Sequence, residues 1–161
     1  MSAARPASIF HWLLAGALAF LVGAIAFALW DARSQINPDD PEQVAEGARL
    51  YDMQCSACHG VNLEGQPGWR KPLPNGRMPA PPHDASGHTW HHPDAILFGI
   101  TKEGMVPGKY APPGYESDMP AFGGVLTDAE IRAVLTYIKS TWPERERAFQ
   151  MDIERKSREI R

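Results

Sequence analysis

A long apolar segment near the N-terminus dominates the hydrophobic pattern of this sequence. Between Pro6 and Trp30 there is no Asp, Glu, Lys or Arg, and the segment is most apolar from Trp12 to Trp30. These nineteen residues, if helical with a rise of about 1.5 Å each, would span roughly 28 Å, close to the bilayer hydrocarbon thickness of about 30 Å. The pattern predicts a single transmembrane helix with a tryptophan at each membrane interface.

The charges on either side of this segment indicate its orientation. Arg5 precedes it, whereas acidic residues outnumber basic ones between Asp31 and Glu42. The positive-inside rule then places the N-terminus in the cytoplasm and the rest of the chain outside. Ala26-Phe27-Ala28 also resembles a signal-peptidase site, so a cleaved signal peptide is the competing interpretation. Both interpretations export the remainder of the chain.

Three shorter amphipathic helices are predicted after a polar linker. The first begins at Pro41, because proline suits the first helical turn. The second begins at Pro93 and ends near Gly104. The third begins with a capping box, Thr127–Glu130, and is ended by Pro143. The apolar faces consist of Val44, Ala48 and Tyr51 in the first helix, and of Ile131, Val134, Leu135 and Ile138 in the third.

The middle of the chain is poor in regular structure. Most of its 15 prolines and 14 glycines lie between Gly60 and Gly124, and such a segment forms little helix or sheet. Few aliphatic residues remain outside the N-terminal segment to form a core. We therefore expect a compact domain that is completed by a buried prosthetic group.

Composition divides the chain into four parts. These are the transmembrane anchor or uncleaved signal (residues 1–30), the linker (31–42), the main domain (43–142) and a charged tail (143–161). The tail mixes acidic and basic residues and predicts a solvent-exposed or frayed helix, with a partner-docking helix as the alternative. The net charge of −3 argues against a nucleic-acid partner.

Cys55, Cys58 and His59 carry the strongest chemical signal. They form a C-x-x-C-H motif, the pattern of covalent c-type haem attachment. Each thiol can add to a vinyl group on the same edge of the porphyrin, and the next imidazole then lies under the iron. A redox-active disulfide needs a strand–helix context that is missing, and a zinc site needs a second cysteine pair, although histidines follow. The motif predicts one covalently bound haem c, with His59 as an iron ligand.

A second iron ligand is expected in the loop before the last helix of the domain. Met119 lies there beside Pro120, which stiffens the loop, and Met105 is the alternative ligand.

A cluster of four histidines could also bind a metal ion. It could form a copper or zinc site or replace Met119 on the iron, but we favour loop histidines that bond backbone groups and propionates. The cluster consists of His83, His88, His91 and His92.

From about Pro41 to Trp142 these features resemble class I c-type cytochromes. That family has an N-terminal helix leading into C-x-x-C-H, a loop-rich middle, a Met-Pro loop and a C-terminal helix that crosses the first. The resemblance implies an all-α, loop-rich fold around one covalent haem, preceded here by the single transmembrane helix. Gly47, Tyr51 and Tyr137 match the family positions where the two helices cross.

The resemblance also implies contacts in the middle segment. In the family a proline carbonyl accepts the proton of the proximal histidine, and Pro67 and Pro72 are the candidates here. Arg77, Trp90 and Tyr110 are candidate partners of the haem propionates. Residues 31–143 include 14 acidic and 9 basic residues. This net charge of −5 departs from the basic soluble carriers with their lysine ring, and the resemblance is closer to membrane-anchored bacterial members.

Together these inferences predict an electron carrier rather than an enzyme. His59 and Met119 would ligate the iron on the periplasmic face of the cytoplasmic membrane, and Met/His ligation raises the reduction potential. Such a protein suits redox partners of the respiratory chain: a quinol-oxidising cytochrome complex, a terminal oxidase or a periplasmic dehydrogenase. The alternative is a haem-based sensor or peroxidase-like enzyme, in which Met119 does not bind and the sixth iron position is open.

Overall fold

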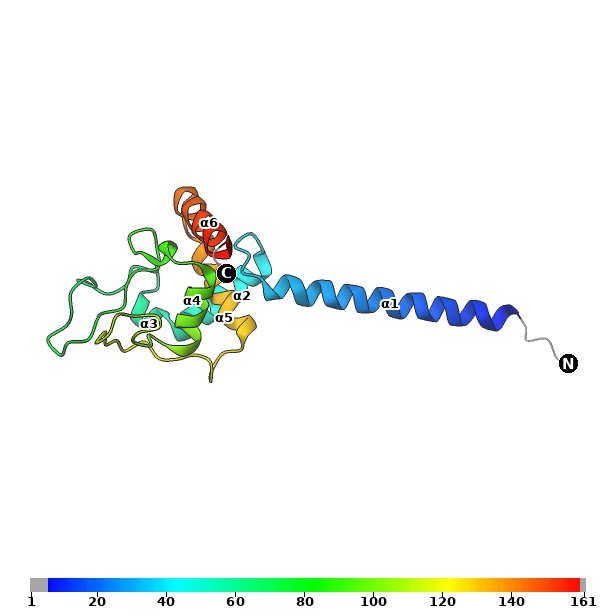
Figure 1. The fold of residues 1–161 in the computed structure, drawn as a ribbon, viewed down its shortest axis with the longest axis horizontal. Helices are drawn as coiled ribbons and strands as arrows, with labels where there is room; N and C mark the ends of the chain where they lie inside the picture. The colour runs from blue at the N-terminus through cyan, green and yellow to red at the C-terminus, as the bar shows by residue number, and fades with distance from the viewer. Residues whose placement is uncertain (1–5, 160–161) are drawn as a thin grey trace. The chain divides into compact units, whose positions relative to one another are not determined.

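The computed structural model describes residues 6–159, and within them the chain forms helices and loops but no strand. This confirms the all-α prediction. Residues 60–88 and 104–127 contain no helix, as the prolines and glycines there indicated. The elements, shown in Figure 1, are α1 (Pro6–Ser34), α2 (Pro41–Gln54), α3 (Ser56–His59), the 3₁₀ turn η1 (Thr89–His91), α4 (Asp94–Glu103), α5 (Asp128–Ser140) and α6 (Glu144–Glu159).

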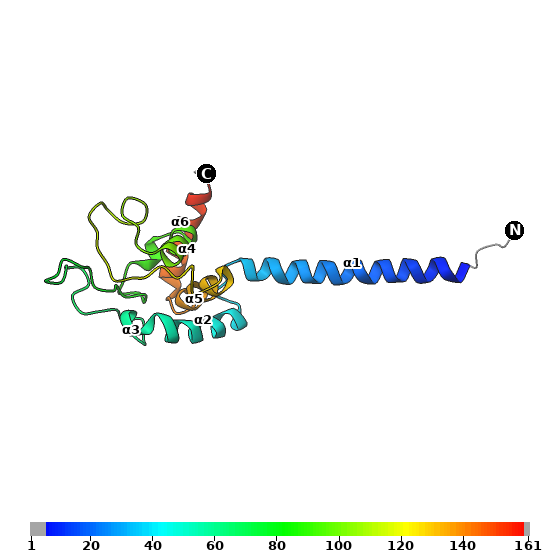
Figure 2. The ribbon, with the colours of Figure 1, turned by 90° about the horizontal axis from the view of Figure 1, so that it is seen from below.

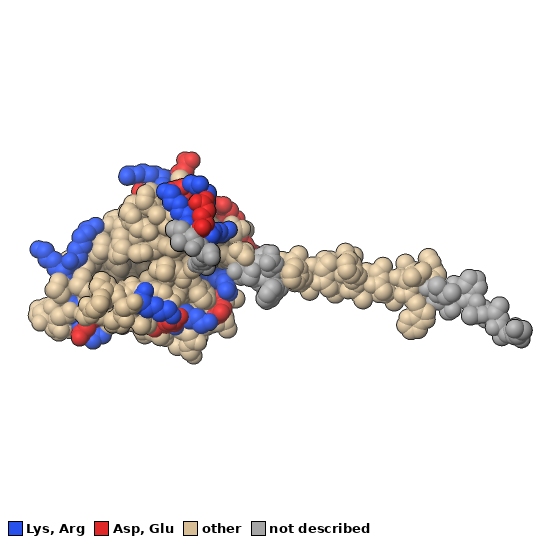
Figure 3. All heavy atoms as spheres, in the orientation of Figure 1, with Lys and Arg blue, Asp and Glu red and all other residues tan. Residues whose placement is uncertain are grey.

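Helix α1 belongs to a separate structural unit that ends at Gln35. Its stretch Phe10–Ala28 comprises 19 residues with a mean hydropathy of 2.0, none of them buried. No charged side chain occurs along this stretch (Figure 3). Helix α1 is therefore long and apolar enough to cross a membrane. It continues to Ser34, so the start of the expected linker is helical. Arg5, on which the predicted orientation rests, lies outside the described residues.

Helices α2 and α5 pack against each other although they are far apart in the sequence (Figure 2). At Gly47 the two helices are so close that a Cβ atom would lie 1.9 Å from the carbonyl oxygen of Ala133. One turn further along α2, the ring centroids of Tyr51 and Tyr137 are 5.4 Å apart. These contacts confirm the helix crossing that the resemblance implied at Gly47, Tyr51 and Tyr137.

Local capping interactions explain where these two helices begin. The carboxylate of Asp40 accepts hydrogen bonds from the first backbone N–H groups of α2, and Pro41 occupies the first turn. Thr127 and Glu130 form the predicted capping box at the start of α5. Both predicted helix starts are confirmed. The buried apolar side chains between the helices include Leu50, Tyr51, Ile131, Val134 and Ile138.

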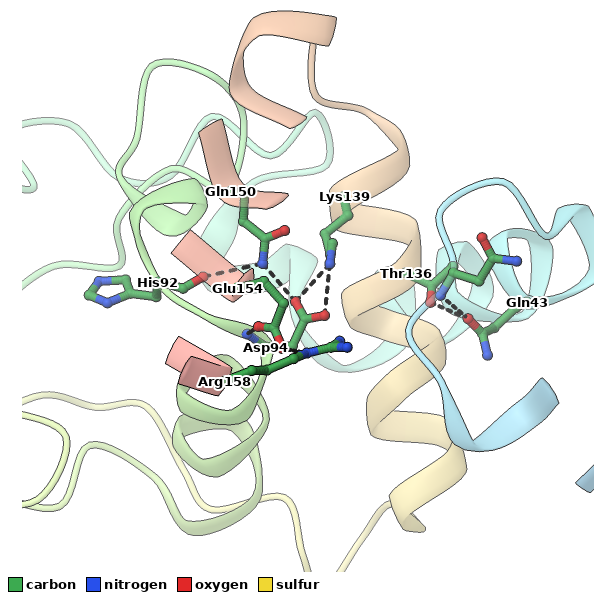
Figure 4. A network of polar contacts seen from close by, with 9 residues as sticks. Gln43, His92, Asp94, Thr136, Lys139, Gln150, Glu154 and Arg158 are labelled. Carbon is green, nitrogen blue, oxygen red and sulfur yellow. Dashed lines mark hydrogen bonds and ion pairs between the residues drawn. The ribbon is translucent and has the colours of Figure 1, made fainter. Parts of the chain in front are cut away.

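The C-terminal helix α6 forms as predicted and most of its residues are exposed or half-buried, but one face packs onto the domain and buries Glu146 and Gln150. Gln150 is 1% exposed, and its Nε2 donates to Asp94 Oδ1 at 2.7 Å. The same carboxylate accepts hydrogen bonds from Lys139 Nζ of α5 at 2.7 and 2.9 Å (Figure 4). Glu154 accepts a hydrogen bond from the backbone nitrogen of Asp94 at 2.9 Å. One polar network therefore joins α6 to α4 and α5.

Candidate functional site

The C-x-x-C-H motif lies where α2 passes into the short helix α3. Cys55 is the C-cap residue of α2, and the single helical turn Ser56–His59 contains Cys58 and His59. Both thiols are free; Cys55 is half-buried and Cys58 is exposed. Burial, reinforced by Cys58, raises the pKa of Cys55 to about 11.

The imidazole of His59 is oriented for metal binding. The residue is 7% exposed, and its Nδ1 lies 2.8 Å from the carbonyl oxygen of Pro81. Because a carbonyl oxygen can only accept, Nδ1 carries the proton and Nε2 keeps its lone pair for a metal. Burial also lowers the pKa of His59, although the bond to Pro81 opposes this shift. The neutral form, which is the ligating form, is therefore favoured.

The carbonyl that accepts this proton belongs to Pro81, not to Pro67 or Pro72 as the sequence analysis suggested. Two hydrogen bonds of 2.9 Å connect Gln66 and Ala80 across the loop and bring Pro81 toward His59. The position of the acceptor thus depends on the path of the whole loop. Proline residues alone do not reveal that path.

The four clustered histidines do not converge on one point. His83 stacks on His59, with ring centroids 4.0 Å apart, whereas His88 stacks on Trp69 at 5.3 Å. In the described part of the chain, no group of three or more His, Cys, Asp or Glu side chains is arranged to hold a metal ion. The suggested copper or zinc site therefore has no support in this geometry. His83 stacks on His59 and its Nδ1 is paired with Thr89, so this geometry gives no support to His83 as an iron ligand in place of Met119.

The loop that carries Met119 is anchored on both sides of this residue. Before it, Arg77 pairs with Asp118, with Nε and Oδ1 2.5 Å apart. After it, the backbone nitrogen of Phe122 donates to the carbonyl oxygen of Thr101 in α4 at 3.0 Å. Met119 itself is half-buried. These contacts restrict the loop, and iron ligation by Met119 stays a prediction.

Trp90 provides an observation that favours a bound haem. Its Nε1 is buried and has no hydrogen-bond partner among residues 6–159. Burying an unpaired N–H group costs about 1–3 kcal/mol, so an acceptor from a ligand is expected there. A haem propionate fits this role. Of the other two suggested propionate partners, Tyr110 donates to Glu103 at 3.1 Å. Arg77 forms an ion pair with Asp118, but its Nε is buried and, like Trp90 Nε1, has no hydrogen-bond partner among residues 6–159.

The helical fold, the C-x-x-C-H motif at the end of α2 and the oriented imidazole of His59 are those expected of a haem protein of the c type. The family model described as Cytochrome c matches residues 44–142, which is more than half of the chain. The chain belongs to the cytochrome c family. It therefore binds one covalently attached haem c and takes part in haem-based electron transfer. Comparisons with curated proteins and with solved structures found no significant match.

Proposed function

We propose that this protein is a membrane-anchored one-electron carrier in which His59 and Met119 ligate the haem iron. The bound haem supplies a one-electron Fe(III)/Fe(II) couple. The observation that carries the proposal is the 2.8 Å contact between His59 Nδ1 and the Pro81 carbonyl. It presents an unprotonated Nε2 directly after the two cysteines that would form the thioether bonds, Cys55 and Cys58. Such a bond also orients a ligating histidine and raises its basicity.

Ligation by Met119 would complete the coordination of the iron and raise the reduction potential, because a thioether favours the reduced ion. Support comes from the two anchors of its loop. The Arg77–Asp118 pair and the Phe122–Thr101 hydrogen bond limit the positions that the methionine side chain can reach. With His59 and Met119 both bound, the iron would have no open site for a substrate. A carrier is therefore favoured over the sensor or peroxidase-like alternative.

The length and composition of α1 support a position in the cytoplasmic membrane. The placement of the haem domain on the outer face rests on the flanking charges, Arg5 before the segment and mostly acidic residues after it. A cleaved signal sequence would share these properties and is the competing interpretation. Residues 35–40 separate the end of α1 from the start of α2. Fully extended, they span about 20 Å, so a retained anchor would keep the domain at high effective concentration near partners in the same membrane. Suitable partners are a quinol-oxidising cytochrome complex, a terminal oxidase or a periplasmic dehydrogenase.

Substitution of the proposed methionine ligand tests this function. The Met119→Ala holoprotein should bind carbon monoxide in the ferrous state, and its reduction potential should fall. The matched control is Met105→Ala, which removes the alternative methionine. This control and the wild type should bind no carbon monoxide and should share one potential.

Two results would contradict the proposal. An unchanged ferric spectrum in Met119→Ala would show that this methionine is not a ligand. Carbon monoxide binding by the wild-type protein would show an open iron position and favour the sensor or peroxidase-like enzyme.

A further inference from the structure

The ring of His83 lies almost flat against the ring of His59. The two centroids are 4.0 Å apart, and the ring planes differ by 20°. His83 therefore covers one face of the imidazole that we propose as the iron ligand. The C-x-x-C-H motif does not require an aromatic ring at this place, so the contact calls for its own explanation.

His83 is held firmly by its surroundings. Its backbone nitrogen donates to the carbonyl oxygen of Leu63, and its carbonyl oxygen accepts from Trp142 Nε1, both at 2.8 Å. The ring nitrogen Nδ1 lies 2.9 Å from Thr89 Oγ1. Tyr51 meets the ring edge-on, with centroids 6.2 Å apart. Because hydrogen bonds hold both its backbone and its ring, the imidazole of His83 has little freedom to move.

The chemistry of the residue argues against a simple space-filling role. An aliphatic side chain could fill the same volume without burying a polar ring, which costs free energy unless the ring is hydrogen-bonded. Here a buried threonine, Thr89, provides the partner for Nδ1. The structure thus retains a flat, polar ring and pairs its Nδ1.

The two contacts of His59 act in perpendicular directions. The hydrogen bond to Pro81 lies along the plane of the His59 ring, because it is made by a ring N–H group. The stacked ring of His83 acts along the normal to that plane. The hydrogen bond thus holds one edge of the His59 ring, and the stacked His83 ring prevents the His59 ring from rotating toward it.

We propose that His83 is a positioning residue, which fixes the orientation of the His59 ring about the iron–nitrogen bond by face-to-face stacking. The inference rests on the proposed function in one respect, since it takes His59 as an iron ligand. A ligand ring held in one orientation in both oxidation states needs little rearrangement when an electron is gained or lost. His83 would therefore support fast electron transfer.

The test compares two substitutions in the full-length holoprotein. His83→Phe keeps a flat ring at this position, whereas His83→Leu keeps an apolar side chain without a flat face. The readouts are the g values of the ferric electron paramagnetic resonance spectrum and the pattern of haem methyl shifts in the nuclear magnetic resonance spectrum. Both report the orientation of the axial ligand plane. The reduction potential and the Tm are measured at the same pH.

The expected result is a shift of the g values and a reordering of the methyl resonances in His83→Leu, with His83→Phe close to the wild type. The proposal is overturned if His83→Leu lowers only the Tm and leaves both spectra unchanged. It is also overturned if His83→Phe changes the spectra as much as His83→Leu does, because a flat ring would then not be the relevant property.

A second pair of variants decides the matter if His83→Leu does not mature. Thr89→Val removes the partner of the His83 ring, and Thr89→Ser keeps it. A spectral shift in Thr89→Val but not in Thr89→Ser supports the proposal, and wild-type spectra in both variants overturn it. Failure of the proposed function would appear differently, as a wild-type protein whose spectra show no histidine-ligated, low-spin haem.

Discussion

Replacement of Gly47 by alanine would test how closely α2 and α5 must approach. The added Cβ would lie 1.9 Å from the carbonyl oxygen of Ala133 and 2.5 Å from its carbonyl carbon. Ordinary van der Waals contact begins at 3.4 Å, so the helices would have to separate by about 1.5 Å, the difference between 3.4 and 1.9 Å. Both opposing atoms belong to the backbone, and no side-chain rotation can relieve the clash.

Two effects of opposite sign act on this variant. Alanine in place of a glycine inside a helix gains about 1 kcal/mol from helix propensity. Forcing an additional group into a packed interface costs about 1–3 kcal/mol, and contact with rigid backbone favours the upper end. Separation of the helices also loosens the packing of Tyr51 against Tyr137 and of the buried side chains around them. We expect a net loss of about 2 kcal/mol, which lowers the Tm by roughly 5–10 °C.

Thermal unfolding of the full-length holoprotein in detergent, followed by far-ultraviolet circular dichroism, measures this effect. The matched control is Gly124→Ala, because a Cβ at Gly124 would meet no atom within 4 Å. Its Tm should stay near the wild-type value. A Tm of Gly47→Ala equal to or above that of the wild type would refute the reasoning, since helix propensity would then outweigh the steric clash.

Two further predictions concern the polar network and the anchor. Lys139→Met should lower the free energy of unfolding by about 3 kcal/mol, because it leaves the largely buried carboxylate of Asp94 without its cation. In contrast, Lys102→Met breaks an exposed pair with Asp128 and should cost about 1 kcal/mol or less; equal losses in urea titrations would contradict this distinction. If α1 is retained, the protein should stay in membranes after alkaline carbonate extraction, whereas a soluble protein beginning at Leu29 would show that the segment is cleaved.

The features that were predicted correctly from the sequence depend on residues close together in the chain. The motif of Cys55, Cys58 and His59 spans five consecutive residues. The capping box at Thr127 and the start of α2 at Pro41 are likewise decided within one helical turn. Helical periodicity adds the apolar face of α5. The short backbone between such residues fixes how they lie relative to one another, so their spacing in the sequence is enough to predict the structure.

The crossing of α2 and α5 was also predicted, although its partners are distant in the sequence. Gly47, Tyr51 and Tyr137 were identified through the resemblance to a known family, not through any local pattern. The close approach at Gly47 then gave the physical reason, since a Cβ there would overlap the backbone of Ala133.

The tertiary structure decided the contacts that join distant segments. It placed the Pro81 carbonyl, 22 residues along the chain, on His59, and it stacked His83 on the same ring. It also buried Gln150 against Asp94, 56 residues away, although the charged composition of the tail indicated exposure. Each of these contacts depends on the path of a loop or on a polar partner contributed by another helix. Hydrophobic periodicity contains neither, because it records only which residues of one segment share a face.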